Sequence, residues 1–413
     1  MTIPILTASA GASWEAMLVS AAGSAGEVEV VRRCVDIVEL VTAGALRTAR
    51  VAMVDGRLPG LDRGVVHALQ SEGVAVVVVA PDAASDSRLR TLGVDVVVAA
   101  SAHPDELIAA MSEALSPRVI KAAAEANPEG RGRVFAVWGA TGAPGRSTVA
   151  MSVADECAAV GVSTLLIDAD VYGGSLAQML GILDEAPGLL AAARLANEGR
   201  LDTDSLRASA RRLPSGLLVL TGVTRPQRWT ELRPEAFLSV LDVARRVADV
   251  VVVDCSFCIE QDEELLFDTM APRRNGVAVS TLASADRILL VAAADPVGLQ
   301  RAVRAGISLA DESQSGPVDV VVTRVRRGPV PGRSPHNHIR ELLSRHLGRS
   351  PIAMVPSDRP ACDRALAQGR TLREVAPSSA ARTAMRDLSR LLVPTSEVGW
   401  LRRRSHPRVV ATA

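Results

Sequence analysis

Apolar, β-branched runs alternate with amphipathic stretches along the first 120 residues. Strand-type runs occur at Ile3–Thr7, Val28–Val31, Val51–Val54, Val74–Val79 and Val94–Val98. Helical periodicity fills the intervals between them, for example over Trp14–Ala22 and Val65–Ser71. Five such strand–helix units predict a doubly wound α/β domain with a parallel sheet over residues 1–120.

The same alternation resumes after a small, polar segment at 121–132, which contains Pro and Gly and is typical of a linker. The predicted strands are Val134–Trp138, Thr164–Asp168, Leu217–Leu220, Val250–Asp254, Ile288–Ala292, Val318–Thr323 and Ile352–Val355. The predicted helices include Ser147–Ala159, Glu235–Val247, Pro296–Leu309 and Ala380–Leu392. The chain is therefore expected to be an α/β protein with a second, larger doubly wound domain at 133–393, whose sheet is mostly parallel, followed by a basic tail at 394–413.

Composition narrows the classes of function. The 413 residues are 48% apolar and carry no net charge, so the overall charge gives no reason to expect nucleic acid as a partner. Five cysteines form no disulfide framework, and we expect the lone Cys255-x-x-Cys258 pair to serve packing after its strand. No apolar run is long enough to cross a bilayer and no secretory signal is evident, which favours a cytoplasmic chain. Lys121 is the only lysine among 46 basic residues.

Val134–Ala150 has the layout of a phosphate-binding loop, with a strand, a Gly-rich turn and Ser-Thr at the start of a helix. Against G-x-x-x-x-G-K-[ST], Gly145 and Ser147 are present, while Ala140 replaces the first Gly and Arg146 the Lys. Backbone N–H groups of such a loop and the following helix attract phosphate, and Ser147 is placed to bind Mg²⁺. Pro144 removes one N–H donor. The alternative is a Gly/Pro turn without a ligand.

Carboxylates follow two of the predicted strands. Asp168 and Asp170 end one buried strand and Asp254 ends another. Strand ends of this kind lie at the same edge of a parallel sheet as the loop, where Mg²⁺ and an attacking water need acceptors. Each Asp alone could be a helix cap or turn residue, but three in this order favour a nucleotide site.

This ordered set resembles the ParA/MinD superfamily of P-loop ATPases, whose deviant loop reads K-G-G-x-G-K-[ST]-T. Thr141–Thr148, TGAPGRST, matches that loop position by position. The resemblance implies that ATP is bound by Gly142, Ala143, Gly145, Arg146, Ser147 and Thr148. Thr141 then replaces the signature Lys of the family, which reaches across a dimer to the partner's nucleotide, and Arg146 replaces the second Lys.

Further segments extend this resemblance over residues 133–393. Leu165–Gly181 is similar to the family's second motif, which implies that Asp170 orients the attacking water with support from Asp168. Val250–Ser256 resembles Walker B, with Asp254 reaching Mg²⁺ through water. The implied catalytic set is Asp170, Asp168 and Arg146, the implied metal set is Ser147, Asp170 and Asp254, and the implied base contacts are Thr323, Pro356 and Asp358.

The N-terminal domain resembles the receivers of response regulators. Val54–Asp62 is similar to their phosphoacceptor strand and loop, which places Asp55 at the acceptor position. Ala100 stands where receivers carry a Lys, and the first strand supplies no acidic pair for Mg²⁺. Phosphotransfer needs both groups to neutralise charge, so we expect Asp55 to be a relic or a turn residue.

A receiver-like domain joined to such an ATPase resembles the CpaE/TadZ group of Flp-pilus assembly proteins and septum-site-determining MinD homologues. This resemblance implies an ATP- and Mg²⁺-binding homodimer that positions a pilus or division complex, with slow hydrolysis because Arg146 alters the phosphate clamp. The alternative is a non-catalytic nucleotide-binding scaffold. DNA binding is disfavoured by the neutral charge. Trp400–Arg404 leaves open a peripheral contact with the inner face of the membrane, although a frayed terminus suits its short length better.

Overall fold

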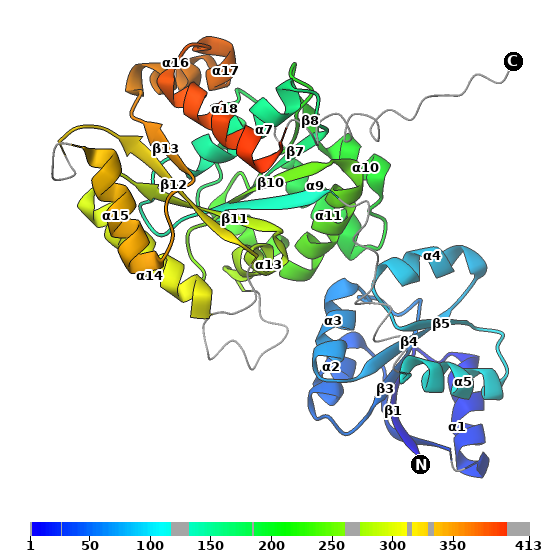
Figure 1. The fold of residues 1–413 in the computed structure, drawn as a ribbon. Coiled ribbons are helices and arrows are strands. Elements are labelled where there is room, and N and C mark those ends of the chain that lie inside the picture. Colours follow the sequence, from blue (N-terminus) through cyan, green and yellow to red (C-terminus); the bar gives the residue numbers. More distant parts are fainter. Residues whose placement is uncertain are drawn as a thin grey trace, which may run out of the picture. The chain divides into compact units, whose positions relative to one another are not determined.

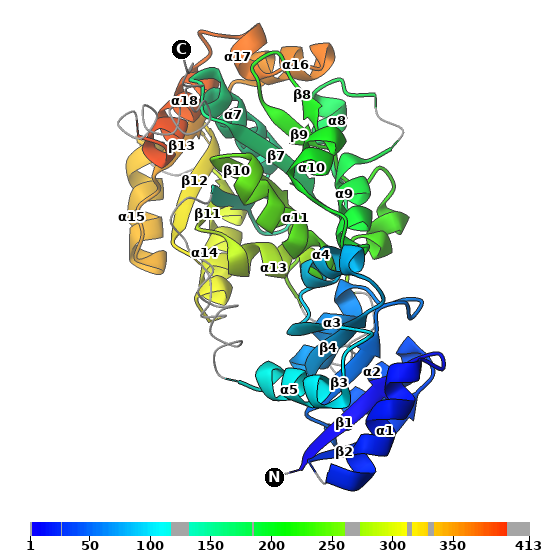
Figure 2. The ribbon, with the colours of Figure 1, turned by 90° about the vertical axis from the view of Figure 1, so that its right-hand side faces the viewer.

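The computed structural model describes residues 2–25, 27–116, 132–183, 186–260, 273–311, 316–328 and 334–394. The chain divides into two compact units, and each is built around one sheet with helices on its faces (Figures 1 and 2). Most of the predicted linker at 121–132 and of the predicted tail at 394–413, with its Trp400–Arg404 cluster, lies outside the described residues.

The described residues of the first unit form five strands and five helices in strict alternation. They are β1 Ile3–Ala8, α1 Ser13–Ala25, β2 Val28–Cys34, α2 Ile37–Ala45, β3 Val51–Asp55, α3 Arg63–Ser71, β4 Ala75–Ala80, α4 Ala83–Thr91, β5 Val96–Ala99 and α5 Pro104–Ala114. The strand order is β2-β1-β3-β4-β5 and every pairing is parallel. This is the flavodoxin-like order of doubly wound folds, which confirms the predicted doubly wound α/β architecture with a parallel sheet.

Side chains of each strand in this unit alternate between two apolar cores. Ala52 and Val54 of β3 pack into the core that also holds residues of α2 and α3. Val51 and Met53 point the other way, into the core with α1 and α5. Both faces of the inner strands β3 and β4 are covered, so these strands are continuous apolar runs that stand out in the sequence, whereas the edge strand β2 exposes Glu29, Arg32 and Arg33.

The second unit is larger and begins at β6. Its elements are β6 Arg133–Trp138, α7 Arg146–Ala159, β7 Thr164–Ala169, α8 Leu176–Met179, α9 Gly188–Asn197, α10 Thr203–Ser209, β8 Arg211–Arg212, β9 Leu218–Leu220, the 3₁₀-helix Pro226–Glu231, α11 Pro234–Val247, β10 Val250–Cys255, α13 Gly276–Ser284, β11 Arg287–Ala293, α14 Pro296–Asp311, β12 Val318–Val325, α15 Pro335–Leu347, β13 Ala353–Pro356, α16 Arg359–Gln368, α17 Leu372–Val375 and α18 Ala380–Leu392. The strand order is β13-β12-β11-β6-β10-β7-β9-β8. Only the short edge strand β8 pairs antiparallel, so the sheet is mostly parallel, as predicted.

Helices α7 and α18 pack against the same face of this sheet. Val149 and Val153 of α7 share one core with Met385 and Leu388 of α18 and with Phe135 of β6. The helix that follows the Gly-rich loop therefore packs on the sheet and beside the C-terminal helix. This packing determines where the N-terminus of α7 lies relative to the ends of the strands.

Candidate functional site

The Gly-rich loop lies between the carboxyl end of β6 and the N-terminus of α7. Gly142 and Gly145 have φ values of 72° and 94°, in the left-handed region that glycine adopts without strain. Gly145 is the N-cap of α7 and provides no side-chain cap. The first N–H groups of α7 are therefore left for an external anion, which the helix dipole also favours.

The three strands that carry the predicted site are neighbours in the sheet. β10 lies between β6 and β7, and Asp254 is paired in register with Val137 on one side and with Asp168 on the other. The two carboxylates thus lie next to each other at the strand ends, beside the loop that follows β6. The structure brings together the residues that the sequence places at one edge, as expected for parallel strands.

Asp254 is a buried carboxylate that makes no hydrogen bond of normal geometry to the described residues. Its exposed fraction is 1%, and neither oxygen has such a bond. Burial and the neighbouring Asp168 raise the pKa of Asp254 well above its usual value, while the Ser147 hydroxyl and the Arg146 guanidinium oppose the shift. A buried carboxylate of this kind is stabilised by a bound cation. The donor set of Asp254 and Ser147 consists of hard oxygens and fits Mg²⁺.

Asp168 serves the turn after β7. Its carboxylate accepts hydrogen bonds from the backbone N–H groups of Asp170 at 3.3 Å and Leu176 at 3.0 Å. Burial raises the pKa of Asp168 to about 7 against the effect of these donors. A Cβ added at Gly174 would lie 2.9 Å from its Oδ1, so the turn closes tightly around the carboxylate. Asp168 therefore positions the segment that carries Asp170.

Arg146 points inward and contacts Asp170. Its Nη1 donates to the carbonyl of Gly139 at 3.0 Å and its Nη2 lies 3.4 Å from Oδ2 of Asp170. The guanidinium lies 5.9 Å from the centre of the Phe257 ring, and only 15% of the side chain is exposed. The other oxygen of Asp170 accepts from the backbone of Tyr172 at 2.9 Å. The residue expected to orient water is thus engaged by the residue expected to bind phosphate.

The three predicted base contacts have other partners in the structure. The Thr323 hydroxyl is buried and donates to the carbonyl of Pro144 at 2.8 Å, so it anchors the phosphate loop to β12. Asp358 caps α16 and accepts from the Ser379 hydroxyl at 2.6 Å. Pro356 ends β13 two residues earlier and is half-buried. Their contact with a nucleotide base stays a prediction.

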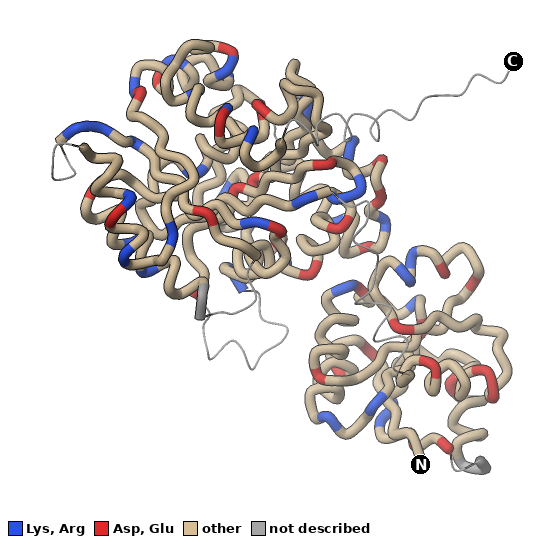
Figure 3. Tube along the Cα trace, viewed as in Figure 1, with Lys and Arg blue, Asp and Glu red and all other residues tan. Residues whose placement is uncertain are grey.

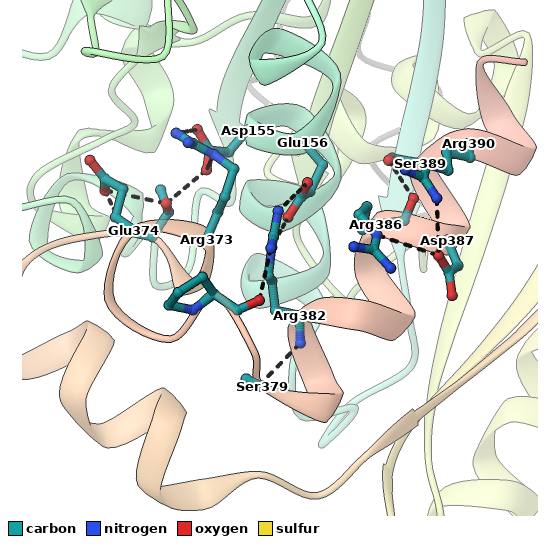
Figure 4. A network of polar contacts seen from close by, with 12 residues as sticks. Asp155, Glu156, Arg373, Glu374, Ser379, Arg382, Arg386, Asp387, Ser389 and Arg390 are labelled. Atoms are coloured by element: carbon teal, nitrogen blue, oxygen red, sulfur yellow. Dashed lines mark hydrogen bonds and ion pairs between the residues drawn. The ribbon is translucent and has the colours of Figure 1, made fainter. Parts of the chain in front are cut away.

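A network of ion pairs that the sequence motifs do not predict joins α7 to α17 and α18 (Figure 4). Asp155 receives a two-pronged pair from Arg373, with Nε to Oδ2 at 2.8 Å and Nη2 to Oδ1 at 3.1 Å. Glu156 receives an equivalent pair from Arg382 at 2.7 and 3.3 Å. Both carboxylates are buried, so α7 is tied to α17 and α18 by charge as well as packing. In the sequence, two adjacent acids within an otherwise apolar helix, Asp155 and Glu156, indicate that buried basic partners are needed.

The phosphoacceptor position of the first unit is closed. Oδ1 of Asp55 accepts from the backbone N–H of Arg57 at 2.8 Å and from its Nε at 3.3 Å. Oδ2 accepts from the indole N–H of Trp14 at 3.3 Å, and the residue is 5% exposed. Donors of the chain itself thus surround this carboxylate, which agrees with the expectation that Asp55 is not a phosphosite.

The described residues offer no further metal cluster, membrane-spanning helix or disulfide. They contain no cluster of three or more His, Cys, Asp or Glu side chains that could hold a metal ion. They also contain no helix long and apolar enough to span a membrane. Cys255 and Cys258 are free thiols, and Cys258 accepts from the Asn275 amide at 3.2 Å, so this pair forms no disulfide. An Mg²⁺ site made from one hydroxyl, phosphates and waters needs no such cluster.

Comparison with known proteins identifies the fold of the second unit. No family model and no curated protein sequence matches the chain. A ParA family ATPase from Chlorobium tepidum TLS is similar in structure, with 20% sequence identity over 62% of this chain and 98% of that chain and a TM-score of 0.52. The septum site-determining protein MinD complexed with Mg-ADP from Pyrococcus horikoshii OT3 is 15% identical over 64% of this chain and 98% of its own, with a TM-score of 0.50. The second unit therefore has the fold of the ParA/MinD ATPases.

Proposed function

We propose that this chain binds Mg·ATP at the Gly-rich loop and works as a positioning protein of the ParA/MinD type. The observation that carries the proposal is Asp254, a buried carboxylate without a partner of normal geometry, adjacent to Asp168 and beside Ser147. A structural turn residue would have its oxygens satisfied by the chain, as those of Asp168 are. An unsatisfied buried carboxylate beside a helix N-terminus suits a site completed by a cation and phosphates.

The residues divide the work as follows. The phosphates are bound by the N–H groups in the first turn of α7, by the backbone of Gly142, Ala143 and Gly145, and by Thr148. Ser147 and Asp254 hold Mg²⁺, which neutralises charge on the phosphate oxygens when bound. Asp170 orients the attacking water, and Asp168 positions Asp170 through their shared turn.

Hydrolysis is expected to be slow, with turnover below the usual enzymatic range of about 1–10³ s⁻¹. The contact of Arg146 with Asp170 at 3.4 Å has to break before either residue serves a nucleotide. The planar guanidinium also differs from the point charge of a Lys ammonium. The same contact favours the second candidate function, a nucleotide-binding scaffold without hydrolysis.

The wider role follows from the resemblance to CpaE/TadZ and septum-site-determining proteins. We propose an ATP-dependent homodimer that positions a pilus or division complex. In this scheme 1–120 is a degenerate receiver-like domain, 121–132 a linker, 133–393 the ATPase domain and 394–413 a tail. Basic and acidic residues are interspersed along the described trace in Figure 3, and the chain carries no net charge, so neither observation supports DNA binding.

Calorimetry and turnover together test this function. Titration with ATP in excess Mg²⁺ should give saturable binding, and no heat at millimolar ATP would overturn the proposal. Arg146→Lys separates the two candidates, because a Lys restores the point charge that such loops use. A sharp gain in turnover would indicate that the remaining groups are competent. Bound ATP without turnover in either form would favour the scaffold.

A further inference from the structure

A second arginine, exposed to solvent, contacts the backbone of the phosphate loop. Arg301 lies on α14, and its Nη1 donates to the carbonyl of Thr141 at 2.9 Å. The same nitrogen would lie 2.5 Å from a Cβ added at Gly142. Only a residue without a side chain at position 142 lets the guanidinium approach this closely. Arg301 and Thr141 are 160 positions apart, so no local motif reveals the contact.

The start of α14 explains why Arg301 reaches the loop. Asp295 accepts a hydrogen bond from the Gly298 N–H at 2.8 Å, which turns the chain directly from β11 into the helix. A Cβ at Gly298 would lie 2.6 Å from that of Ala293, so the first turn of α14 packs closely on the end of β11. β11 pairs with β6, the strand that leads into the loop. Adjacent strand ends thus bring the two segments together.

The guanidinium of Arg301 retains capacity for a ligand. It has five N–H donors, and in the described part of the chain it makes only the bond to Thr141. The residue is exposed, whereas Arg146 is directed inward toward Asp170. The solvent side of the loop therefore presents a planar cation next to backbone groups suited to phosphate. Guanidinium and phosphate match in both charge and geometry.

We infer that Arg301 is a phosphate-binding residue of the nucleotide site and supplies from α14 a positive charge that Thr141 does not carry. This inference rests on the proposed function, since it assigns a second cation to the same phosphate clamp. The opposing explanation is that Arg301 only braces the loop through its bond to Thr141. Under that explanation, charge at position 301 has no effect on nucleotide affinity.

The affinity of Arg301 variants for ATP separates these explanations. Arg301→Gln keeps an amide that can donate to Thr141 and removes the charge. We expect it to weaken Mg·ATP binding by about tenfold, a loss of about 1.4 kcal/mol, because the charge-assisted hydrogen bond to phosphate is removed. It should also flatten the dependence of affinity on salt. Arg304→Gln, at an exposed arginine of the same helix, is the matched control and should change neither property. Thr141→Lys introduced into the Arg301→Gln protein should restore binding.

Each result decides between the explanations. Unchanged affinity in Arg301→Gln would overturn the assignment while leaving the ATP site intact. Weaker binding with an unchanged salt dependence would identify Arg301 as a loop brace and would also overturn it. Absence of ATP binding by the unaltered protein would reject the proposed function itself, together with this inference. Thermal unfolding of every variant verifies that the chain remains folded.

Discussion

At the residue scale, the site is defined by carboxylates in different environments. Asp168 is satisfied by backbone donors, Asp170 by backbone donors and an arginine, and Asp254 by no bond of normal geometry. Their shared edge could be predicted from sequence, because carboxyl ends of parallel strands lie together. Their different partners could not, since these depend on side-chain rotamers and on the turn through Gly174.

Asp170→Asn tests the contact between Arg146 and Asp170. The change removes a negative charge near the phosphates and releases the guanidinium, so ATP should bind about fivefold more tightly, for an ion pair of about 1 kcal/mol. Any hydrolysis should fall, because the proposed water-orienting group is lost. Fluorescence titration with a labelled ATP analogue measures the affinity. Asp363→Asn, at an exposed acid of α16, is the control, and equal affinities in all three proteins would refute the contact's role.

The environment of Glu15 makes the stability of the first unit depend on pH. Burial alone would raise the pKa of Glu15, but an ion pair with Arg33 and hydrogen bonds from two hydroxyls lower it below its ordinary 4.5. A group with a lowered folded-state pKa contributes stability above its unfolded pKa and loses it as pH falls through the folded value. Protection of β1 amides from hydrogen exchange should therefore hold at neutral pH and decline below about pH 4.5.

Glu15→Gln supplies the control for this pH effect. The variant should be less stable at pH 7, and its stability should fall less steeply as the pH drops below about 4.5, because it has no carboxylate to protonate at this position. If its stability falls with pH as steeply as that of the unaltered protein, other carboxylates cause the loss.

At the scale of elements, strands were easier to predict than polar links between helices. The runs at Val51–Val54 and Val250–Asp254 were recognisable because both faces of each sheet are covered. Strand β8, of two residues, has no such signal. The pairs that join α7 to the C-terminal helices link residues 218 and 226 positions apart, and periodicity carries no information on them.

Arg373→Met tests the link between α7 and α17. It leaves the buried Asp155 without its ion-pair partner and with only the hydrogen bond from the Thr371 hydroxyl, which should lower the free energy of unfolding by about 3 kcal/mol. Chemical denaturation measures the change. Arg390→Met, whose pair with Asp387 is exposed on both sides, should alter stability by less than about 0.5 kcal/mol. Replacing Asp155 by Leu in the Arg373→Met protein should recover part of the loss, and no recovery would contradict the explanation by an unpaired charge.

At the scale of the whole molecule, two α/β units of different architecture share one chain. The first has the flavodoxin-like strand order and a closed acceptor position, and the second has the ParA/MinD fold with a loop in which Arg146 replaces the usual Lys. The alternation of strands and helices predicts two doubly wound α/β units, and the motifs of the loop and strand ends, not the alternation, indicate the ParA/MinD fold of the second. The state of each site depends on single side chains, such as Trp14 over Asp55, and required the structure.

The proposed dimer gives a prediction at this scale. Mg·ATP should shift the sedimentation coefficient from monomer to dimer, because nucleotide bound by both copies would join them. Mg·ADP serves as the comparison. Sedimentation that is the same with ATP, with ADP and without nucleotide would contradict ATP-dependent dimerisation while leaving nucleotide binding intact.

We propose that Asp254 and Ser147 complete an Mg²⁺-dependent ATP site beside the Gly-rich loop. The most direct test is calorimetric titration of ATP with and without Mg²⁺, for the unaltered protein and for Asp254→Asn. We predict that Mg²⁺ tightens ATP binding at least about tenfold in the unaltered protein, a gain of about 1.4 kcal/mol, and that this gain disappears in Asp254→Asn. An equal gain in both proteins, or no binding in either, would contradict the account.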